Sequence, residues 1–382
     1  MTMMPAPLTN THIHTNYSFG VFTSPDEAVE QAVAEGISIL GINDHYTIAG
    51  HDAFRRACDA RGVCPLFSME AVALDLDAQK AGKRLNDPGN PGRCYLTAKS
   101  VTTPLAAGTK AAKALDQMRA ALTARNAVLV GNLNRHLESA GVPVQLDMAA
   151  VEALTPAGNT TERHVVQALA EAILGRGAEA AALFERLCGA PPPGLDNAGT
   201  LQDWLRGKLI KAGCPDYAPE LPEAFLPMAD MVDLYLALGA IPTYPVLGNP
   251  LTEVEKDIPA LLDWCASLRI FAIEVIPNRN TRERLLEIVE AAGRAGVPVF
   301  TGTEHNTKTP GPLVDRFSRE APFRTAFFNG ALVALGHAEE VQRGKGGYVD
   351  QTGALRFADR AKGLAHFIEV GKRKFTTKAP RH

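Results

Sequence analysis

The sequence predicts an α/β fold in which parallel strands lie inside and helices cover them. Segments with the patterns of strands and helices alternate strictly in the first third of the chain, and again after about residue 226. Such alternation is typical of parallel strands joined by helices. The 382 residues are also enough for one large barrel or two medium domains with an ample core. In such folds the active site gathers at the C-terminal ends of the strands.

The first third of the chain contains three predicted strands and two predicted helices. Ser24 has the position of a helix N-cap, because a proline and two acidic residues follow it in the expected first turn. Gly36 would end this helix, and Gly62 would end the next one. The strands are expected over residues 8–14, 37–42 and 63–69, and the helices over residues 25–35 and 51–60.

The middle of the chain has a different composition. Residues 82–108 have the pattern of loops with one candidate strand over 94–99. Residues 110–212 are rich in alanine and show helical periodicity without strand patterns. We interpret residues 101–225 as a mostly helical insertion in the barrel. Its expected helices include residues 111–123, 163–174 and 178–187.

The alternation resumes after the insertion. Strands are expected over residues 240–244, 271–276 and 297–301, and helices near residues 228–238, 253–267 and 281–295. Residues 1–100 and 226–345 would then form the barrel. Residues 346–382 would form a C-terminal extension that is glycine-rich and then basic, and we expect its end to be solvated and partly disordered.

The composition is that of an ordinary soluble enzyme. The chain is 46% hydrophobic and 21% charged with a formal net charge of -3, so nothing draws it to nucleic acid or membranes. No apolar run reaches the roughly 20 residues of a membrane helix, and the N-terminus lacks the pattern of a signal peptide. Six cysteines without a Cys-x-x-Cys pair indicate reduced thiols. We expect a cytoplasmic protein, and nothing in the sequence predicts its oligomeric state.

Two histidines near the N-terminus are the first candidates for metal ligands. His12 and His14 lie two residues apart on a predicted strand, so their side chains point to the same face. Paired imidazoles suit a transition-metal ion, although an isolated pair is as often a surface or hydrogen-bonded pair. Here His45, Glu70 and Glu304 also follow short apolar runs. This places all five side chains at strand ends.

Together these motifs resemble those of the polymerase and histidinol phosphatase (PHP) family of metal-dependent phosphoesterases. The matching segments are His12-Ile-His14-Thr with Ser18 and Gly20 after it, Gly41-Ile-Asn-Asp44-His45, Glu70, Ala272-Ile-Glu274-Val and Gly302-Thr303-Glu304. Residues 162–169 are similar to a helical stretch of members that cleave nucleotides or short oligonucleotides. The resemblance covers roughly residues 8–310. It implies a distorted (β/α)7 TIM-like barrel of the PHP type with a helical insertion.

The resemblance also implies roles for individual residues. The expected metal ligands are His12, His14, His45, Glu70 and Glu304. Glu70 would bridge two ions if a second one binds. Asp44 and His164 are expected to act in catalysis, with His164 protonating the leaving oxygen or ligating metal from an insertion that folds over the barrel mouth. Arg279, in a loop at a strand end, would bind phosphate bidentately.

Several positions depart from the family pattern. Phe19 stands in place of an aspartate, and Tyr244 and Asn306 stand in place of histidines, which leaves one firm metal site and a second one open. A tyrosine has to ionise to bind metal comparably. We therefore expect Tyr244 not to be a ligand, and its hydroxyl to meet the substrate or a metal-bound water. The other histidines are expected to be structural, namely His51, His136, His305, His337, His366 and His382.

The predicted function is hydrolysis of a small phosphorylated metabolite or nucleotide by a metal-activated water. The divalent ion would be manganese, zinc or iron, because the expected ligands mix nitrogen and oxygen donors. No basic, aromatic-rich stripe indicates long nucleic acid as a partner. Two alternatives stay open: a metal-dependent hydrolase or lyase for a non-phosphate substrate, and a degenerate barrel that binds a ligand without catalysis.

Overall fold

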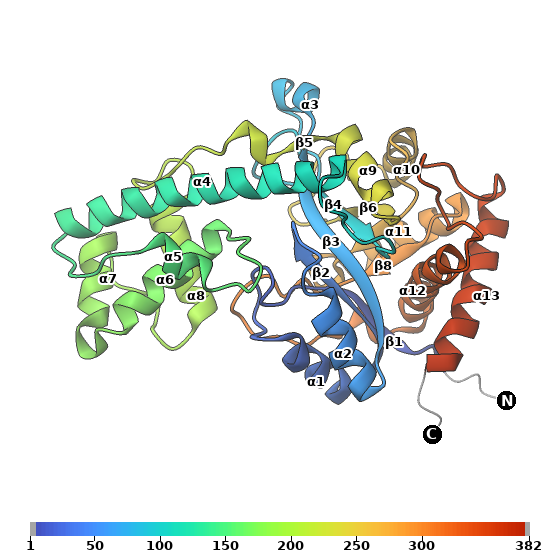
Figure 1. Ribbon diagram of the computed structural model, residues 1–382, viewed down its shortest axis with the longest axis horizontal. Coiled ribbons are helices and arrows are strands. Elements are labelled where there is room, and N and C mark those ends of the chain that lie inside the picture. The colour runs from blue at the N-terminus through green and yellow to red at the C-terminus, as the bar shows by residue number, and fades with distance from the viewer. Residues whose placement is uncertain (1–4, 379–382) are drawn as a thin grey trace.

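The protein folds as an α/β barrel with a helical arm on one side (Figure 1). The computed structural model describes residues 5–378. Around a nearly closed sheet the strands follow the order β1-β2-β3-β4-β6-β7-β8, and β5 pairs with β3. The strands are β1 (Leu8–Ile13), β2 (Ile37–His45), β3 (Cys64–Leu74), β4 (Arg93–Lys99), β5 (Leu226–Pro227), β6 (Ile241–Val246), β7 (Ile273–Val275) and β8 (Val299–Thr301). The predicted distorted (β/α)7 TIM-like barrel is confirmed.

The two ends of the sheet meet where the chain leaves β8. Thr11 Oγ1 on β1 donates a hydrogen bond to the carbonyl oxygen of Thr301 at 2.8 Å. The backbone N–H of Glu304 donates to the carbonyl oxygen of His12 at 3.1 Å, and the N–H of His14 donates to the carbonyl oxygen of Glu304 at 2.9 Å. These bonds place the first and last strands side by side and hold the barrel closed.

One strand of the barrel runs against its neighbours. β4 is antiparallel to β3 and to β6, whereas the other neighbouring strands of the barrel are parallel. The connection from β3 to β4 contains only loops and the five-residue α3 (Leu76–Lys80). Without a helical crossover the chain turns back beside β3, which gives an antiparallel pair. The sequence predicted parallel strands, and β4 is the exception.

Helices cover the outside of the sheet, and most of the predicted ends agree with the structure, although the helix expected near residues 253–267 begins at Ile258 and α12 was not predicted. Ser24 Oγ accepts a hydrogen bond from the N–H of Glu27, as an N-cap does. Gly62 ends the second helix with a φ of 71°, a left-handed conformation that glycine adopts without strain. The covering helices are α1 (Pro25–Ala34), α2 (His51–Arg61), α9 (Met228–Ala237), α10 (Ile258–Ser267), α11 (Arg282–Ala295) and α12 (Ala321–Gln342). Over residues 5–378 no helix is both long and apolar enough to cross a membrane.

Polar side chains line the inside of the barrel, and register places them in rows. Glu70 on β3 pairs with His45 on β2 and with Thr97 on β4. Thr97 in turn pairs with Thr243 on β6. Lys99 lies two residues after Thr97 and so shares its face. A small barrel normally fills its interior with packed side chains, so histidine, carboxylate and hydroxyl groups here indicate a binding site.

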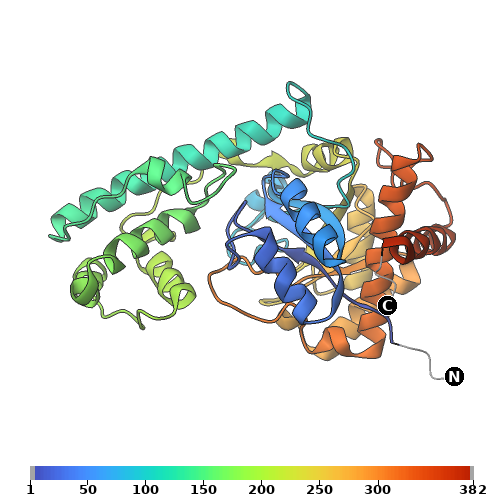
Figure 2. The ribbon, with the colours of Figure 1, turned by 60° about the horizontal axis from the view of Figure 1, so that its bottom comes forward.

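The helical insertion forms an arm with a hydrophobic core of its own. Its longest helix, α4 (Lys110–Ser139), runs from the barrel along the arm (Figures 1 and 2). The other helices are α5 (Met148–Glu152), α6 (Glu162–Leu174), α7 (Ala180–Cys188) and α8 (Ala198–Leu205). Their buried apolar side chains pack with those of the second half of α4, separately from the core of the barrel.

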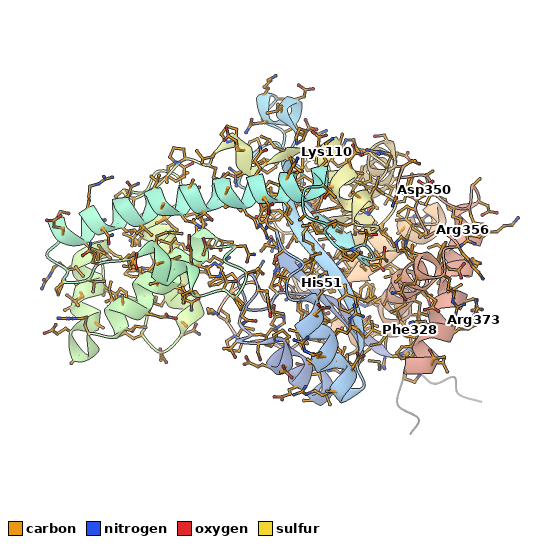
Figure 3. The ribbon with its side chains drawn as sticks, in the orientation of Figure 1. His51, Lys110, Phe328, Asp350, Arg356 and Arg373 are labelled. Carbon is orange, nitrogen blue, oxygen red and sulfur yellow. The ribbon has the colours of Figure 1, made fainter. Side chains whose placement is uncertain are left out.

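The C-terminal part is more ordered than expected. α13 (Arg360–Lys378) packs along α12, whose Phe328 is labelled in Figure 3. The Phe328 ring meets Phe375 of α13 edge-on, and Phe367 of the same helix is fully buried. Because α13 has this apolar side, the expected partial disorder is wrong for it. His382 lies outside the described residues.

Candidate metal centre

Three side chains of the metal-ligand type meet inside the barrel, two from the C-terminal end of β1 and one from the middle of β3. His12 Nε2 and His14 Nε2 are 3.1 Å apart. They lie 3.4 and 3.3 Å from Glu70 Oε2, and all three side chains are at most 5% exposed. Within residues 5–378, they form the group of three histidine, cysteine or acidic side chains whose ligand atoms all lie within 4.8 Å of one another. We call them the metal-ligand group.

Hydrogen bonds behind the two imidazoles orient their Nε2 lone pairs toward each other. His12 Nδ1 lies 2.9 Å from Glu274 Oε2 and so donates its proton to that carboxylate. His14 Nδ1 lies 3.2 Å from Ser18 Oγ, whose own proton goes to Asp44 Oδ1 at 2.6 Å. Both Nε2 atoms are then acceptors facing a third acceptor, the carboxylate of the group. Such an arrangement needs a cation between its members, so the residues fit a divalent metal ion.

Without a metal, a proton takes the place of the cation. Burial lowers the pKa of His12, but the carboxylates of Glu274 and Glu70 outweigh burial and raise this pKa to about 9. Metal binding would have to release this proton. Asn43 Nδ2 lies 2.8 Å from His12 Nε2, so this amide must also turn aside for a metal ion.

His45 lies at the edge of the metal-ligand group. Its Nδ1 is 3.5 Å from Glu70 Oε2, and its ring stacks on His14 with centroids 4.3 Å apart. Burial and the neighbouring His14 lower the pKa of His45 to about 3, so the ring is neutral. Its Nδ1 is buried without a hydrogen-bond partner. His45, an expected ligand, therefore lies beside the metal-ligand group, with a ring nitrogen that no hydrogen bond engages next to the shared carboxylate.

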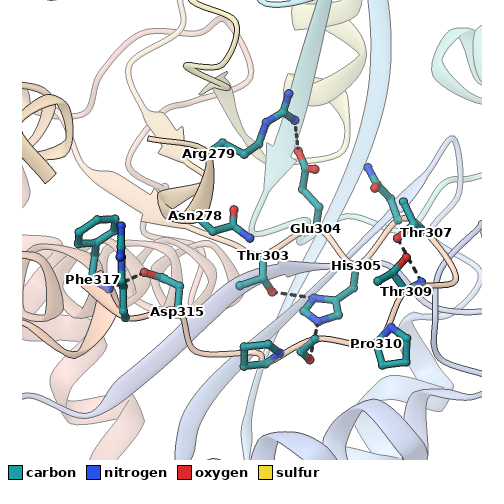
Figure 4. Close-up of a pocket in the computed structure, with 14 residues that line it drawn as sticks. Asn278, Arg279, Thr303, Glu304, His305, Thr307, Thr309, Pro310, Asp315 and Phe317 are labelled. Atoms are coloured by element: carbon teal, nitrogen blue, oxygen red, sulfur yellow. Dashed lines mark hydrogen bonds and ion pairs between the residues drawn. The ribbon is translucent and has the colours of Figure 1, made fainter. Parts of the chain in front are cut away.

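Glu304, an expected ligand, faces away from the group in this structure. Its Oε1 lies 3.4 Å from Arg279 Nη1, and both residues line a hollow of about 570 Å³ (Figure 4). Glu304 has a φ of 63°, a left-handed conformation that is uncommon outside glycine. The longer side chain and the attraction of Arg279 direct the carboxylate out of the group. The prediction that Glu304 completes the group is not met here, and Arg279 faces Glu304 instead of the centre.

Asp44 holds a loop and does not face the cavity of the site. Its carboxylate accepts hydrogen bonds from the N–H and Oγ1 of Thr15, both at 2.7 Å, and from Ser18 Oγ. Asp44 is buried. The expected catalytic role is therefore not supported, and the side chain positions the loop behind His14.

His164 docks the arm on the barrel. Its Nδ1 accepts from the N–H of Thr161 at 2.9 Å, and its Nε2 donates to the carbonyl oxygen of Ser18 at 2.9 Å. Burial lowers the pKa of His164 to about 4. The arm does fold onto the loop beside the centre, as expected. However, both ring nitrogens are engaged, so the ring is available neither as a ligand nor as a proton donor.

Tyr244 points out of the barrel. Its ring packs edge-on against Trp264 of α10, in the layer between sheet and helices, and its buried hydroxyl has no hydrogen-bond partner. Burial raises its pKa well above the ordinary value. The residue is no neighbour of the metal-ligand group, and the expectation that its hydroxyl meets substrate is wrong. Thr243 has the inward position in β6 instead.

Two residues behind the centre were missed by sequence reasoning about the site. Lys99 Nζ lies 2.6 Å from Glu274 Oε1, and the other oxygen of this carboxylate holds His12. Both side chains are at most 2% exposed. A lysine at the end of a mostly buried strand was the available signal for Lys99. Glu274 was noticed within its motif but was given no role.

A cavity of about 190 Å³ lies between the arm and the barrel mouth, with His45 in its wall. More cationic than acidic side chains line it, namely Arg93, Arg125, Arg163, Arg206 and Lys211 against Asp87, Glu162 and Glu220. Glu162, at the start of α6, meets Arg125 Nη1 at 3.1 Å, Arg206 Nη2 at 2.6 Å and Lys211 Nζ at 2.8 Å. The excess of positive charge favours an anionic ligand.

The PHP domain model matches residues 10–139. The resemblance to the PHP family is thereby confirmed for a part of the chain that includes His12, His14, His45 and Glu70. A search of curated proteins gives no match.

Two solved structures have a similar fold. A proposed metal-dependent phosphoesterase from Bifidobacterium adolescentis matches with a TM-score of 0.54 at 19% identity, covering 85% of this chain and 96% of that protein. An amidohydrolase from Chromobacterium violaceum, solved with bound sulfate and no metal, matches with a TM-score of 0.53 at 15% identity, covering 80% and 92%. At these identities the likeness shows the fold. Together with the PHP match and the metal-ligand group, it supports a metal-dependent hydrolase.

Proposed function

We propose that the protein is a metal-dependent phosphoesterase that hydrolyses a small phosphorylated metabolite or nucleotide. The observation that carries this proposal is the position of the cation-rich cavity directly beside the metal-ligand group. His45 connects the two, because its ring lines the cavity and its Nδ1 lies 3.5 Å from Glu70 Oε2. A substrate in the cavity would therefore hold an anionic group next to the metal.

His12, His14 and Glu70 would hold the ion, and His45 lies near enough to Glu70 to join them. When bound, the ion supplies a water of lowered pKa as nucleophile and polarises the phosphoryl group. Nitrogen and oxygen donors of this kind suit manganese, zinc or iron.

The cationic side chains of the cavity would bind and orient the substrate. Guanidinium groups match phosphate oxygens with paired hydrogen bonds. Arg206 Nε is buried without a hydrogen-bond partner, so it has a proton to donate to an anion. Arg163 lies over the Phe19 ring, 5.8 Å from its centre, in the same wall. We assign the orientation of the phosphoryl group to these two arginines.

A substrate whose anionic group is a carboxylate would suit the same charges. The test therefore screens metal-loaded protein against phosphate monoesters, phosphate diesters and carboxylate esters. We expect metal-dependent release of phosphate or alcohol from phosphoesters. Full metal occupancy with turnover of carboxylate esters alone, or of none of these compounds, would contradict the proposal.

A substitution in the cavity tests how the substrate is held. Arg206→Gln should raise KM about tenfold, the value of one charge-assisted hydrogen bond, and leave metal content unchanged. The exposed Arg176 on the same arm offers a control, since Arg176→Gln should leave KM unchanged. An unchanged KM for Arg206→Gln would place the substrate elsewhere.

A further inference from the structure

Lys99 is a buried cation directly behind the metal-ligand group. It is 1% exposed. Its Nζ contacts two oxygens, Glu274 Oε1 at 2.6 Å and the carbonyl oxygen of Thr11 at 2.9 Å. Both of these contacts are with oxygen, the kind of ligand that also binds hard metal cations.

Further oxygens on the same inner face have no partner. Ser68 Oγ and Thr97 Oγ1 are buried without a hydrogen bond, as is Asn43 Oδ1. These residues belong to β3, β4 and β2, the strands that surround the metal-ligand group. The barrel interior therefore presents buried oxygen atoms that no hydrogen bond engages, and Lys99 supplies the positive charge among them.

The two carboxylate oxygens of Glu274 face two different neighbours, although Oε1 meets Lys99 as an ion pair and has no hydrogen bond of its own. Oε1 faces Lys99 Nζ, and Oε2 accepts from His12 Nδ1. An ionised carboxylate in such a buried position is costly unless a cation accompanies it. With Lys99 present, this charge is balanced from within the chain, and Glu274 fixes the His12 ring instead of ligating metal.

We infer that Lys99 is an internal substitute for a second metal ion, and that it restricts the centre to one divalent ion. The inference rests on the proposed metal centre. Lys99 acts as a positioning residue, because it keeps Glu274 turned to His12 and occupies an oxygen-lined cation position of its own. A chain without the ammonium group would offer Glu274 and its neighbouring oxygens to a second ion.

The test counts bound ions and does not depend on activity. Wild-type protein loaded with manganese should hold one ion per chain by elemental analysis. Lys99→Ala removes the ammonium group and opens its space, and this variant should hold two. The matched control Lys99→Ala/Glu274→Gln removes both charges and should return to one.

The outcomes separate the inference from the proposed function. If the wild-type protein binds no ion, the proposed metal centre itself is wrong. One ion in the wild-type protein and one in Lys99→Ala would overturn the inference alone, as would two ions in the wild-type protein.

Lys99→Met gives a second readout if Lys99→Ala does not fold, because methionine keeps most of the volume. Loss of the positive charge should tighten binding of the single ion about tenfold in calorimetry, and Lys99→Arg should restore the wild-type affinity. A merely structural lysine would give equal or weaker metal binding in Lys99→Met, and that result would refute the inference.

Discussion

The barrel interior contains a buried ionic cluster and the arm a partly exposed one, in which Lys211 is 50% exposed, and the two clusters are unbalanced in opposite directions. In the barrel, Glu70 and Glu274 face the single cation Lys99, so one negative charge is left when the histidines are neutral. At the arm, one carboxylate faces three cations: Glu162 faces Arg125, Arg206 and Lys211. The nearby Asp203 is itself shared between Arg206 and Arg163, so it does not remove the excess.

Unbalanced charge is costly to the extent that it is buried, so each cluster is more stable when a ligand of the opposite sign completes it. The barrel cluster calls for a cation and the arm cluster for an anion. Because His45 belongs to the wall between them, the two ligands would lie next to each other. The comparison thus supports the proposed site, in which a metal ion would lie next to an anionic substrate.

The largest expected effect comes from removing the carboxylate that faces the ion. Glu70→Gln takes away the negative charge of the metal-ligand group and should weaken manganese binding at least about 100-fold, the upper end for the loss of a supporting partner of a ligand. Calorimetry and elemental analysis measure this effect, and circular dichroism checks the fold. Glu283→Gln, at an exposed position on α11, serves as the control. Equal affinity in Glu70→Gln and Glu283→Gln would place the metal elsewhere.

An intermediate effect is expected at the arm. Glu162→Gln leaves its three cations without their shared counter-charge and should destabilise the protein by about 1–3 kcal/mol. Inorganic phosphate should raise the melting temperature of this variant more than that of the wild-type protein, because an anion can replace the lost charge. A variant that is as stable as the wild-type protein, with no larger response to phosphate, would show that the cluster is already balanced.

The same carboxylate should make stability depend on pH. Burial alone would raise the pKa of Glu162, but Lys211 and Arg206 lower it well below the ordinary value of 4.5. A carboxyl group whose pKa is lowered by folding stabilises the fold fully above its unfolded pKa, and this contribution is lost as the pH falls toward the folded pKa. The melting temperature of the wild-type protein should therefore fall more steeply below pH 4.5 than that of Glu162→Gln. Parallel melting curves of the two proteins would contradict this assignment.

Local pattern was sufficient to predict the centre of the site. Alternation along one strand put His12 and His14 on one face. Glu70 was expected at a strand end; it lies within β3, which continues to Leu74, but on the face that turns into the barrel. The prediction failed where a contact depends on another part of the chain. The conformation at Glu304 and its contact with Arg279 decide where that carboxylate points, and no pattern near Glu304 reveals this.

Side-chain direction in β6 was the second failure. A one-residue difference in register exchanges the two faces of a strand, and the prediction placed Tyr244 on the face that Thr243 occupies. Lys99 and Glu274 show the same limitation. Each lies on its own strand, and only the closed barrel brings the two charges together.

The smallest effect on metal content is expected at Tyr244. Since this ring packs against Trp264 outside the barrel, Tyr244→His should leave the number of ions per chain unchanged. It should lower the melting temperature, because a large buried ring is lost. Elemental analysis beside thermal unfolding measures both quantities. A gain of one ion would show that the side chain can turn inward and would contradict the assignment of Tyr244 to the outer face of β6.

The barrel can close only late in synthesis on the ribosome, because its closing contacts join the first and last strands. Thr11 and its neighbouring histidines are among the first residues synthesised, whereas their partner Thr301 follows 290 residues later. At roughly 5–20 residues per second this delay lasts about 15–60 s. Throughout that interval the nascent chain carries His12 and His14 without the last strand that fixes them. A chain that stopped short of Glu304 would contain His12, His14 and Glu70 and would still lack the closed wall that holds them together.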